Sequence, residues 1–110
     1  MSKHEEYYER INNIEVIENP TEEHKSSITH QLLAGAAAFE AMRLYNKKKE
    51  EEGEAVDHAT AKEFLAAFTG ATVDRLVETK GLDWLDREKA KHQAKEEAQK
   101  LYSQETGFQF

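Results

Sequence analysis

The sequence contains no cysteine, one proline and only five glycines among its 110 residues. Without cysteine, the chain can form no disulfide, no thiolate nucleophile and no zinc site built on thiolates. Few helix breakers and 34% charged residues of alternating sign favour long helices over a sheet. We therefore expect one all-α domain, a small helical bundle with a modest core.

The chain has no excess of basic residues and no long apolar run. The chain has 15 Lys and Arg and 22 Asp and Glu, so its net charge is −7. A negative charge of this size repels nucleic acid and anionic lipid. The longest uncharged run, residues 26–39, would extend about 21 Å as a helix, short of a bilayer core of roughly 30 Å. The first ten residues carry no apolar run of the signal-peptide type. These absences predict no nucleic-acid binding, no stable membrane insertion and a cytoplasmic location.

Motifs for catalysis and cofactor binding are also absent. The chain has no HExxH, no GxSxG elbow and no glycine-rich phosphate loop. Its serines stand in capping or helix-end contexts rather than beside a base. We expect a non-enzymatic protein without a cofactor.

The least polar stretch, SITHQLLAGAAAFEAMRLY at residues 27–45, organises the rest of the chain. Its centre, Ala34 to Ala38, has almost no side-chain bulk, and Glu40 and Arg43 are its only charged residues. A helix that is apolar nearly all round belongs in the middle of a bundle. We predict a central helix over 27–50, capped by Ser26 or Ser27, and a loop that follows it near Gly53.

A second central helix is predicted over 58–80. Asp57 suits the N-cap, and Lys80-Gly81 is a typical helix stop. Bulky residues such as Phe64 and Phe68 form one apolar stripe of this helix, and smaller residues form another. Two stripes imply two neighbours, which could be the preceding helix or a second copy of the protein. The positions predicted for close helix packing or an interface are Ala34, Gly35, Ala38, Ala66, Gly70, Val73 and Val77. We expect a homo-oligomer, and an unidentified protein partner also fits this pattern.

The two ends of the chain are less determined. Residues 3–18 could form an amphipathic helix or a loosely held arm, and residues 21–25 read as a polar link. A last helix, capped by Asp83 and ended by Gly107, is predicted to lie outside the bundle over 83–105. The tail with Phe108 and Phe110 could fold back on the core or stay exposed. The predicted division is an arm at 1–25, a helical domain at 26–105 and a tail at 106–110.

Histidines and carboxylates on the predicted helices offer an alternative function. Glu88 and His92 are four residues apart, as are Asp74 and Glu78, so each pair can share a helix face. Bundles hold metals through such side chains on facing helices, although the Glu-x-x-His spacing of di-iron bundles is absent. The simpler interpretation is structural histidines and surface ion pairs. The candidate metal ligands are His30, His58, His92, Glu88, Asp74 and Glu78.

Three blocks in order, LAGAAAFEAM, AKEFLAAFTGATVDRLVETKGLD and DREKAKHQA, resemble the CipC-like proteins of fungi, which have relatives in some bacteria. The resemblance covers residues 26–102. It implies an association with stress and antibiotic response, and no established activity, cofactor or catalytic residue. Gln93 stands where we expect histidine in many relatives. The sequence thus predicts a stress-associated helical protein that acts by self-association or partner binding, with metal or small-ligand binding as the alternative.

Overall fold

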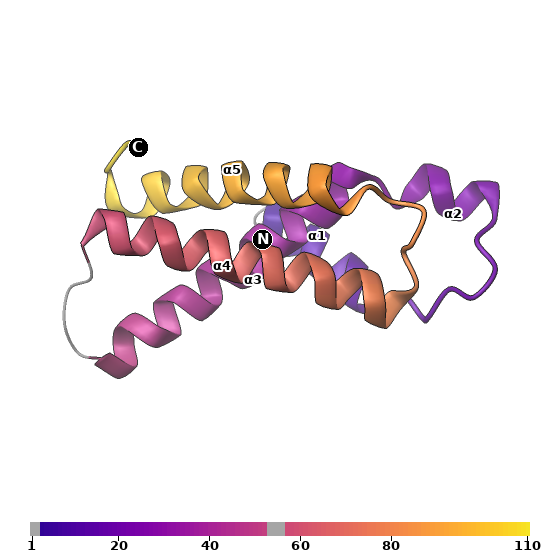
Figure 1. Ribbon diagram of the computed structural model, residues 1–110, viewed down its shortest axis with the longest axis horizontal. Coiled ribbons are helices and arrows are strands. Elements are labelled where there is room, and N and C mark those ends of the chain that lie inside the picture. The colour runs from indigo at the N-terminus through magenta and orange to yellow at the C-terminus, as the bar shows by residue number, and fades with distance from the viewer. Residues whose placement is uncertain (1–2, 53–56) are drawn as a thin grey trace.

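The computed structural model describes residues 3–52 and 57–110, and within these ranges every regular element is a helix. The helices are α1 (Lys3–Asn12), α2 (Glu22–Ser27), α3 (His30–Glu52), α4 (His58–Lys80) and α5 (Arg87–Thr106). The long helices α3, α4 and α5 pack against one another, and α2 lies at one end of the molecule (Figure 1). The predicted all-α bundle is confirmed.

Helix α3 is the centre of this bundle, and it contacts α1, α4 and α5. Its apolar middle is buried on all sides, since Leu33, Ala36, Ala37 and Ala41 have no exposed surface. Small side chains let three neighbours approach one helix, which explains why this stretch has so little bulk. In the part of the chain that the structure describes, no helix has the length and apolar character needed to span a membrane.

The core has two parts along the length of α3. The first gathers residues of α1, the start of α3, the second half of α4 and the start of α5, including Ile11, Leu33 and Leu76. The second joins the later part of α3 to the start of α4 and the end of α5, with Leu65 and Tyr102 at its centre. Alanine dominates the contact surface of α5, so this helix lies close to α3.

Helix α1 is docked on α3, which decides between the two predictions for the N-terminal segment. Ile11 is fully buried, and the ring of Tyr7 packs directly against Gly35, where a Cβ atom would collide with the ring. At the start of α1, His4 Nε2 lies 2.8 Å from a carboxylate oxygen of Glu97 on α5. Because Gly35 has no side chain, it leaves room for the Tyr7 ring of α1, and α1, not α4, packs closely at this position.

Residues 13–20 form a loop, so α1 ends at Asn12 and is shorter than the helix over residues 3–18 that was one of the two predicted possibilities. The N–H of Ile17 donates to the carbonyl of Lys80 at 3.0 Å. Lys80 Nζ in turn donates to the carbonyls of Asn12 and Ile14, at 3.0 and 2.7 Å. These bonds satisfy backbone groups at the ends of α1 and α4, so the loop is anchored to the C-terminus of α4.

Three predicted helix ends are confirmed. Asp57 accepts a hydrogen bond from the N–H of Thr60 at 2.8 Å and so caps α4. Gly81 ends α4 and Gly107 ends α5, both in the left-handed conformation with φ of 71° and 78°. At Gly81 the carbonyl of Ile17 also lies where a Cβ would be, so glycine is needed there for two reasons.

The predicted start of α3 is wrong by a few residues. Ser26 and Ser27 end α2, a short helix in the segment that the sequence suggested was a polar link. Thr29 caps α3 instead, because its hydroxyl oxygen accepts from the N–H of Leu32 at 3.1 Å. The loop predicted near Gly53 lies outside the described residues.

The predicted cap of α5 is also wrong. Asp86, not Asp83, caps α5, because its carboxylate accepts from the N–H of Lys89. The helix therefore begins at Arg87. Leu82 and Leu85 are both buried, and the N–H of Leu85 donates to the carbonyl of Leu82. Burying both leucines in one turn delays the start of the helix by about one turn.

Candidate functional site

The structure places the three candidate histidines in three separate environments. His30 lies at the start of α3, where its Nε2 accepts from the backbone N–H of Asp86 at 2.9 Å. This bond ties α3 to the N-cap of α5. His30 is thus a structural link between two helices.

His58 begins α4 and contacts α5 and the C-terminal tail. Its Nδ1 lies 2.5 Å from the hydroxyl oxygen of Tyr102, which is buried. The ring of Phe108 stacks on the imidazole, with 3.6 Å between centroids and 5° between planes. The contacts of His58 with the described part of the chain are therefore aromatic and phenolic.

His92 lies on the outer face of α5, and its side chain is 74% exposed. Its Nε2 is 3.0 Å from Glu96, one turn further along the helix. Glu88, the predicted partner of His92, instead lies 3.8 Å from Lys91 Nζ. The pairing predicted from the spacing is replaced by contacts with other neighbours.

Asp74 and Glu78 on α4 face two cations of α5. Arg87 Nη1 lies 3.3 Å from a carboxylate oxygen of each, and Lys91 Nζ lies 3.0 Å from Asp74. The hydrogen bond from Lys91 is the largest cause that lowers the pKa of Asp74, and Arg87 adds to it. Side-chain cations thus occupy the space in which a metal ion would have to sit.

The six candidate ligands do not form one metal centre. Across residues 3–52 and 57–110, no group of three or more His, Asp or Glu side chains is placed to hold a metal ion. The ion pairs between α4 and α5 are those that the sequence suggested as the simpler interpretation.

An aromatic cluster that the sequence did not predict closes one end of the bundle. Tyr45 and Tyr102 are buried and meet edge to face, with 5.7 Å between their centroids. Phe110 packs on both Tyr102 and Phe108, at 5.2 and 5.3 Å. Burial, with a smaller effect of Tyr102, raises the pKa of Tyr45. The tail therefore folds back on the core, which was one of the two predicted possibilities.

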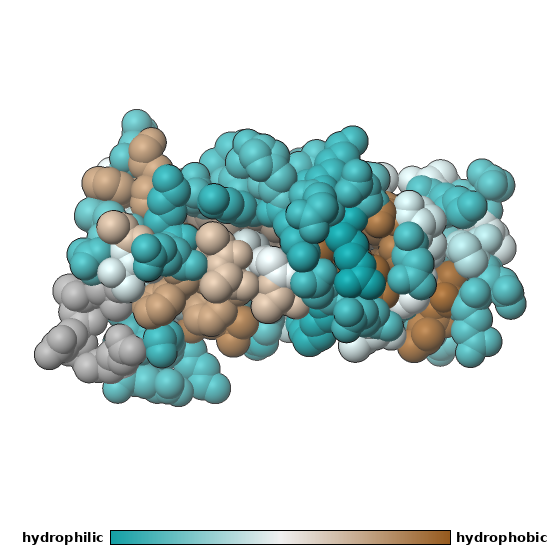
Figure 2. All heavy atoms as spheres, in the orientation of Figure 1, coloured by the Kyte–Doolittle hydropathy of each residue, from teal (hydrophilic) through white to brown (hydrophobic). Residues whose placement is uncertain are grey.

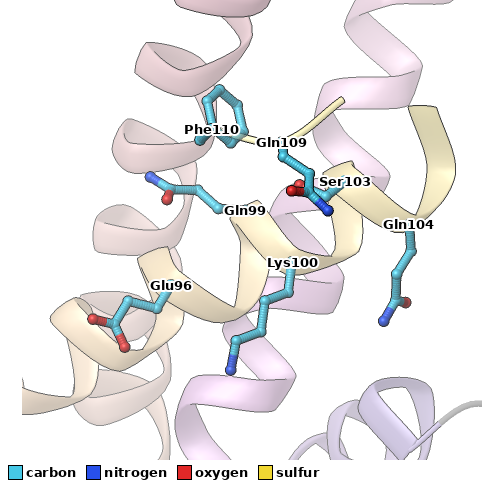
Figure 3. Close-up of a pocket in the computed structure, with 7 residues that line it drawn as sticks. All are labelled: Glu96, Gln99, Lys100, Ser103, Gln104, Gln109 and Phe110. Atoms are coloured by element: carbon cyan, nitrogen blue, oxygen red, sulfur yellow. The ribbon is translucent and has the colours of Figure 1, made fainter. Parts of the chain in front are cut away.

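A cavity of about 500 Å³ lies between this folded tail and α5 (Figure 3). Figure 3 shows Gln99 and Ser103 of α5 on one side and Gln109 and Phe110 of the tail above them. Most of its lining is uncharged and polar, and Glu96 and Lys100 are its charged members. The lining offers hydrogen-bond groups without a nucleophile and base in contact.

The seven predicted interface positions do not form one surface. Five are buried inside the bundle, and they are Ala34, Gly35, Ala38, Val73 and Val77. Ala66 and Gly70 are half-buried, and a Cβ added at Gly70 would meet nothing within 4 Å. Thr69 and Thr72, not Ala66 and Gly70, are the buried residues in this part of α4. The small stripe of α4 therefore divides between the core and the surface.

Helix α4 also carries an apolar stripe at the edge of the core, and part of this stripe is exposed. We call Phe64, Ala67, Phe68 and Ala71 the α4 outer stripe. Their spacing of three and four residues places them on one face. The two alanines are exposed and the two phenylalanines half-buried, with ring centroids 6.0 Å apart. Figure 2 shows apolar residues gathered over the N-terminal half of α4 on the face in view.

Phe64 and Phe68 pack against the core, as the sequence predicted for these bulky residues, whereas the exposed alanines beside them were not predicted as a surface. The available signal was the absence of any charged residue from 64 to 73, which spans almost three turns of helix. A helix with only one buried face would have charged side chains on the other. The uncharged run therefore predicts an apolar face beyond the one that is fully buried.

Comparison with known proteins identifies the family. The family described as virulence factor CipC-like matches residues 13–105, which include α2 to α5 and almost all of the core. No curated protein and no solved structure matches the chain. The chain belongs to the virulence factor CipC-like family.

Proposed function

We propose that this protein is a non-enzymatic helical protein that acts by self-association through the α4 outer stripe, in the stress-associated role that the family resemblance implies. The observation that supports it is the stripe itself. A contiguous apolar patch on a protein surface marks an interaction site, whereas single exposed apolar residues do not. The outer stripe joins two aromatic rings to two exposed alanines on one face.

The order of residues in the stripe favours a second copy of this chain as the partner. In an antiparallel pair of α4 helices centred between Ala67 and Phe68, Phe64 of each copy faces Ala71 of the other. Ala67 likewise faces Phe68. A two-fold interface requires such self-complementarity, because a residue i that contacts residue j of the partner copy implies that j of the first copy contacts i of the partner. Large side chains then meet small ones throughout, which lets the helices pack closely.

Charges at the ends of the stripe fit the same arrangement. Glu63 and Arg75 are exposed and lie just beyond the two ends. The antiparallel register brings Glu63 of one copy close to Arg75 of the other, and opposite charges help to fix orientation. A parallel pair would instead place each residue near its own equivalent, with rings opposite rings and like charges together.

Sedimentation velocity of the parent and two glutamate variants tests the proposal. Ala67→Glu places a charge at the centre of the stripe on an exposed position, so the fold should survive. We expect the dimer dissociation constant to rise about tenfold or more, because a carboxylate would be desolvated without a partner. Ala59→Glu, at an exposed position of α4 outside the stripe, is the matched control and should associate like the parent.

Two results would overturn this proposal. One is a parent protein that stays monomeric at all accessible concentrations. The other is an oligomer that tolerates Ala67→Glu as well as it tolerates Ala59→Glu, because association would then use a different surface. Circular dichroism of all three proteins separates a lost interface from a lost fold.

A further inference from the structure

A cavity of about 440 Å³ opens between the end of α1, helix α2 and the start of α3. Its apolar part comes from Ile14, Ile28 and Leu32, of which the last two are only 4% and 3% exposed. Clefts of this size that combine an apolar floor with a few polar groups are typical of small-molecule sites. The cavity lies at the opposite end of α4 from the outer stripe, so it is independent of self-association.

The polar part of this cavity comes from Arg10, Asn13, His24 and Ser27, and the Ser27 hydroxyl already donates to the carbonyl of His24 at 3.4 Å. Within the described ranges of the chain, Arg10 forms no ion pair and the side-chain amide of Asn13 forms no hydrogen bond, whereas the backbone N–H of Asn13 donates to the carbonyl of Glu9. His24 Nδ1 accepts from the N–H of Thr21 at 3.2 Å, as part of the capping box of α2. In the neutral imidazole the proton therefore lies on Nε2, which remains free to donate. Three donors thus border one apolar floor.

The charge of this lining is opposite to that of the protein as a whole. Arg10 is its one full charge and no Asp or Glu belongs to it, although the chain carries a net charge of −7. Other cavities contain glutamates: Glu105 beside Phe39, and Glu96 with Glu97 near Gln31. A guanidinium with free donors around it suits a carboxylate, which it can bind in bidentate fashion.

We infer that this cavity binds a small amphiphile with an anionic head, in the form of an aliphatic carboxylate. The carboxylate accepts hydrogen bonds from Arg10, Asn13 and His24 Nε2. The aliphatic chain lies on Ile14, Ile28 and Leu32. Binding therefore needs both parts of the ligand, the charge and the apolar chain.

Titrations of the full-length protein, followed by amide and methyl chemical shifts in NMR, test the site. The probes are octanoate, butanoate, octanol and inorganic phosphate. Octanoate should shift resonances of Ile14, Ile28 and Leu32 and bind about fourfold more tightly for each CH₂ that it has beyond butanoate. Octanol lacks the charge and phosphate lacks the chain, so both should bind at least tenfold more weakly than octanoate.

Substitution of the arginine gives the matched comparison. Arg10→Gln should weaken octanoate binding at least tenfold, because a charge-assisted hydrogen bond is lost. Lys95→Gln, at an exposed lysine of α5 that does not line the cavity, should leave octanoate binding unchanged. Equal affinities for octanoate and octanol would overturn the inference, as would tight binding of phosphate alone or shifts that avoid the three apolar residues. An Arg10→Gln protein that binds octanoate like the parent would also overturn it.

Discussion

Gly35 and Gly70 show how much a single residue depends on its neighbours. Both stand inside central helices among alanines, and the sequence assigned both to close packing. In the structure a Cβ at Gly35 would collide with the ring of Tyr7, whereas the same atom at Gly70 would meet open space. The sequence could not separate them, because the partner of Gly35 comes from α1, 28 residues earlier in the chain.

Alanine substitution should therefore have opposite effects at the two glycines. Gly70→Ala should raise the free energy of unfolding by about 0.5–1 kcal/mol, because alanine loses less backbone entropy in a helix and nothing obstructs its methyl group. Gly35→Ala should lower it by about 1–3 kcal/mol, because the ring of Tyr7 must move and α1 loosens. Urea denaturation measures both, and a stabilised Gly35→Ala would show that α1 does not pack there.

The histidines illustrate a different limit of prediction at this scale. Spacing along a helix showed that His92 and Glu88 can share a face, and it could not show that Glu96 lies closer in practice. The contact between His58 and Tyr102 joins residues 44 positions apart, and the stacked Phe108 comes from the tail. No pattern within one helix contains such information. The candidate site was therefore the part least predictable from the sequence.

At the scale of elements, local signals succeeded where they acted alone. Asp57, Gly81 and Gly107 set helix ends through capping and left-handed backbone, which are local properties. Prediction failed where two local signals competed. Asp83 and Asp86 can both cap a helix, and the burial of Leu82 and Leu85 selects the second. Helix α2 has no buried residue, so its sequence lacks the apolar periodicity from which a helix could be predicted.

The ion pairs between α4 and α5 make the stability of this helix pair depend on pH. Lys91 and Arg87 lower the pKa of Asp74 below its unfolded value of about 3.9, so the stability that the Asp74 carboxylate contributes is complete only above about pH 5. It is lost as the pH falls through the lowered pKa. Asp74→Asn should therefore destabilise the protein by up to about 1 kcal/mol near neutral pH, a modest amount because the carboxylate is partly exposed.

Thermal unfolding as a function of pH checks this prediction. The difference between the parent and Asp74→Asn should shrink as the solution becomes acidic. The control is Asp83→Asn, because Asp83 is 85% exposed and lies 3.9 Å from Arg87. This variant should differ little from the parent at any pH. Equal losses in the two variants would assign the effect to net charge and not to the contacts with Lys91 and Arg87.

At the scale of the whole molecule, the two apolar faces of α4 explain why a small, highly charged chain carries so little charge in its centre. One face completes the core with Leu65, Val73 and Leu76. The other is the outer stripe, in which Phe64 and Phe68 are half-buried at the edge of the core and Ala67 and Ala71 are exposed. The chain measures about 46 × 27 × 23 Å, and helices α1, α4 and α5 already pack around α3. Within residues 3–52 and 57–110, no helix covers Ala67 and Ala71 on the outer side of α4.

Salt should strengthen the self-association that we propose. The interface is apolar, while each copy carries a net charge of −7, so two copies repel each other at long range. Raising the ionic strength from about 0.01 M to about 0.15 M shortens the Debye length from about 30 Å to about 8 Å and screens this repulsion. The dimer dissociation constant measured by sedimentation should then fall. Weaker association in salt would mean that ion pairs, such as Glu63 with Arg75, and not the apolar stripe, hold the copies together, because screening acts against attraction between opposite charges.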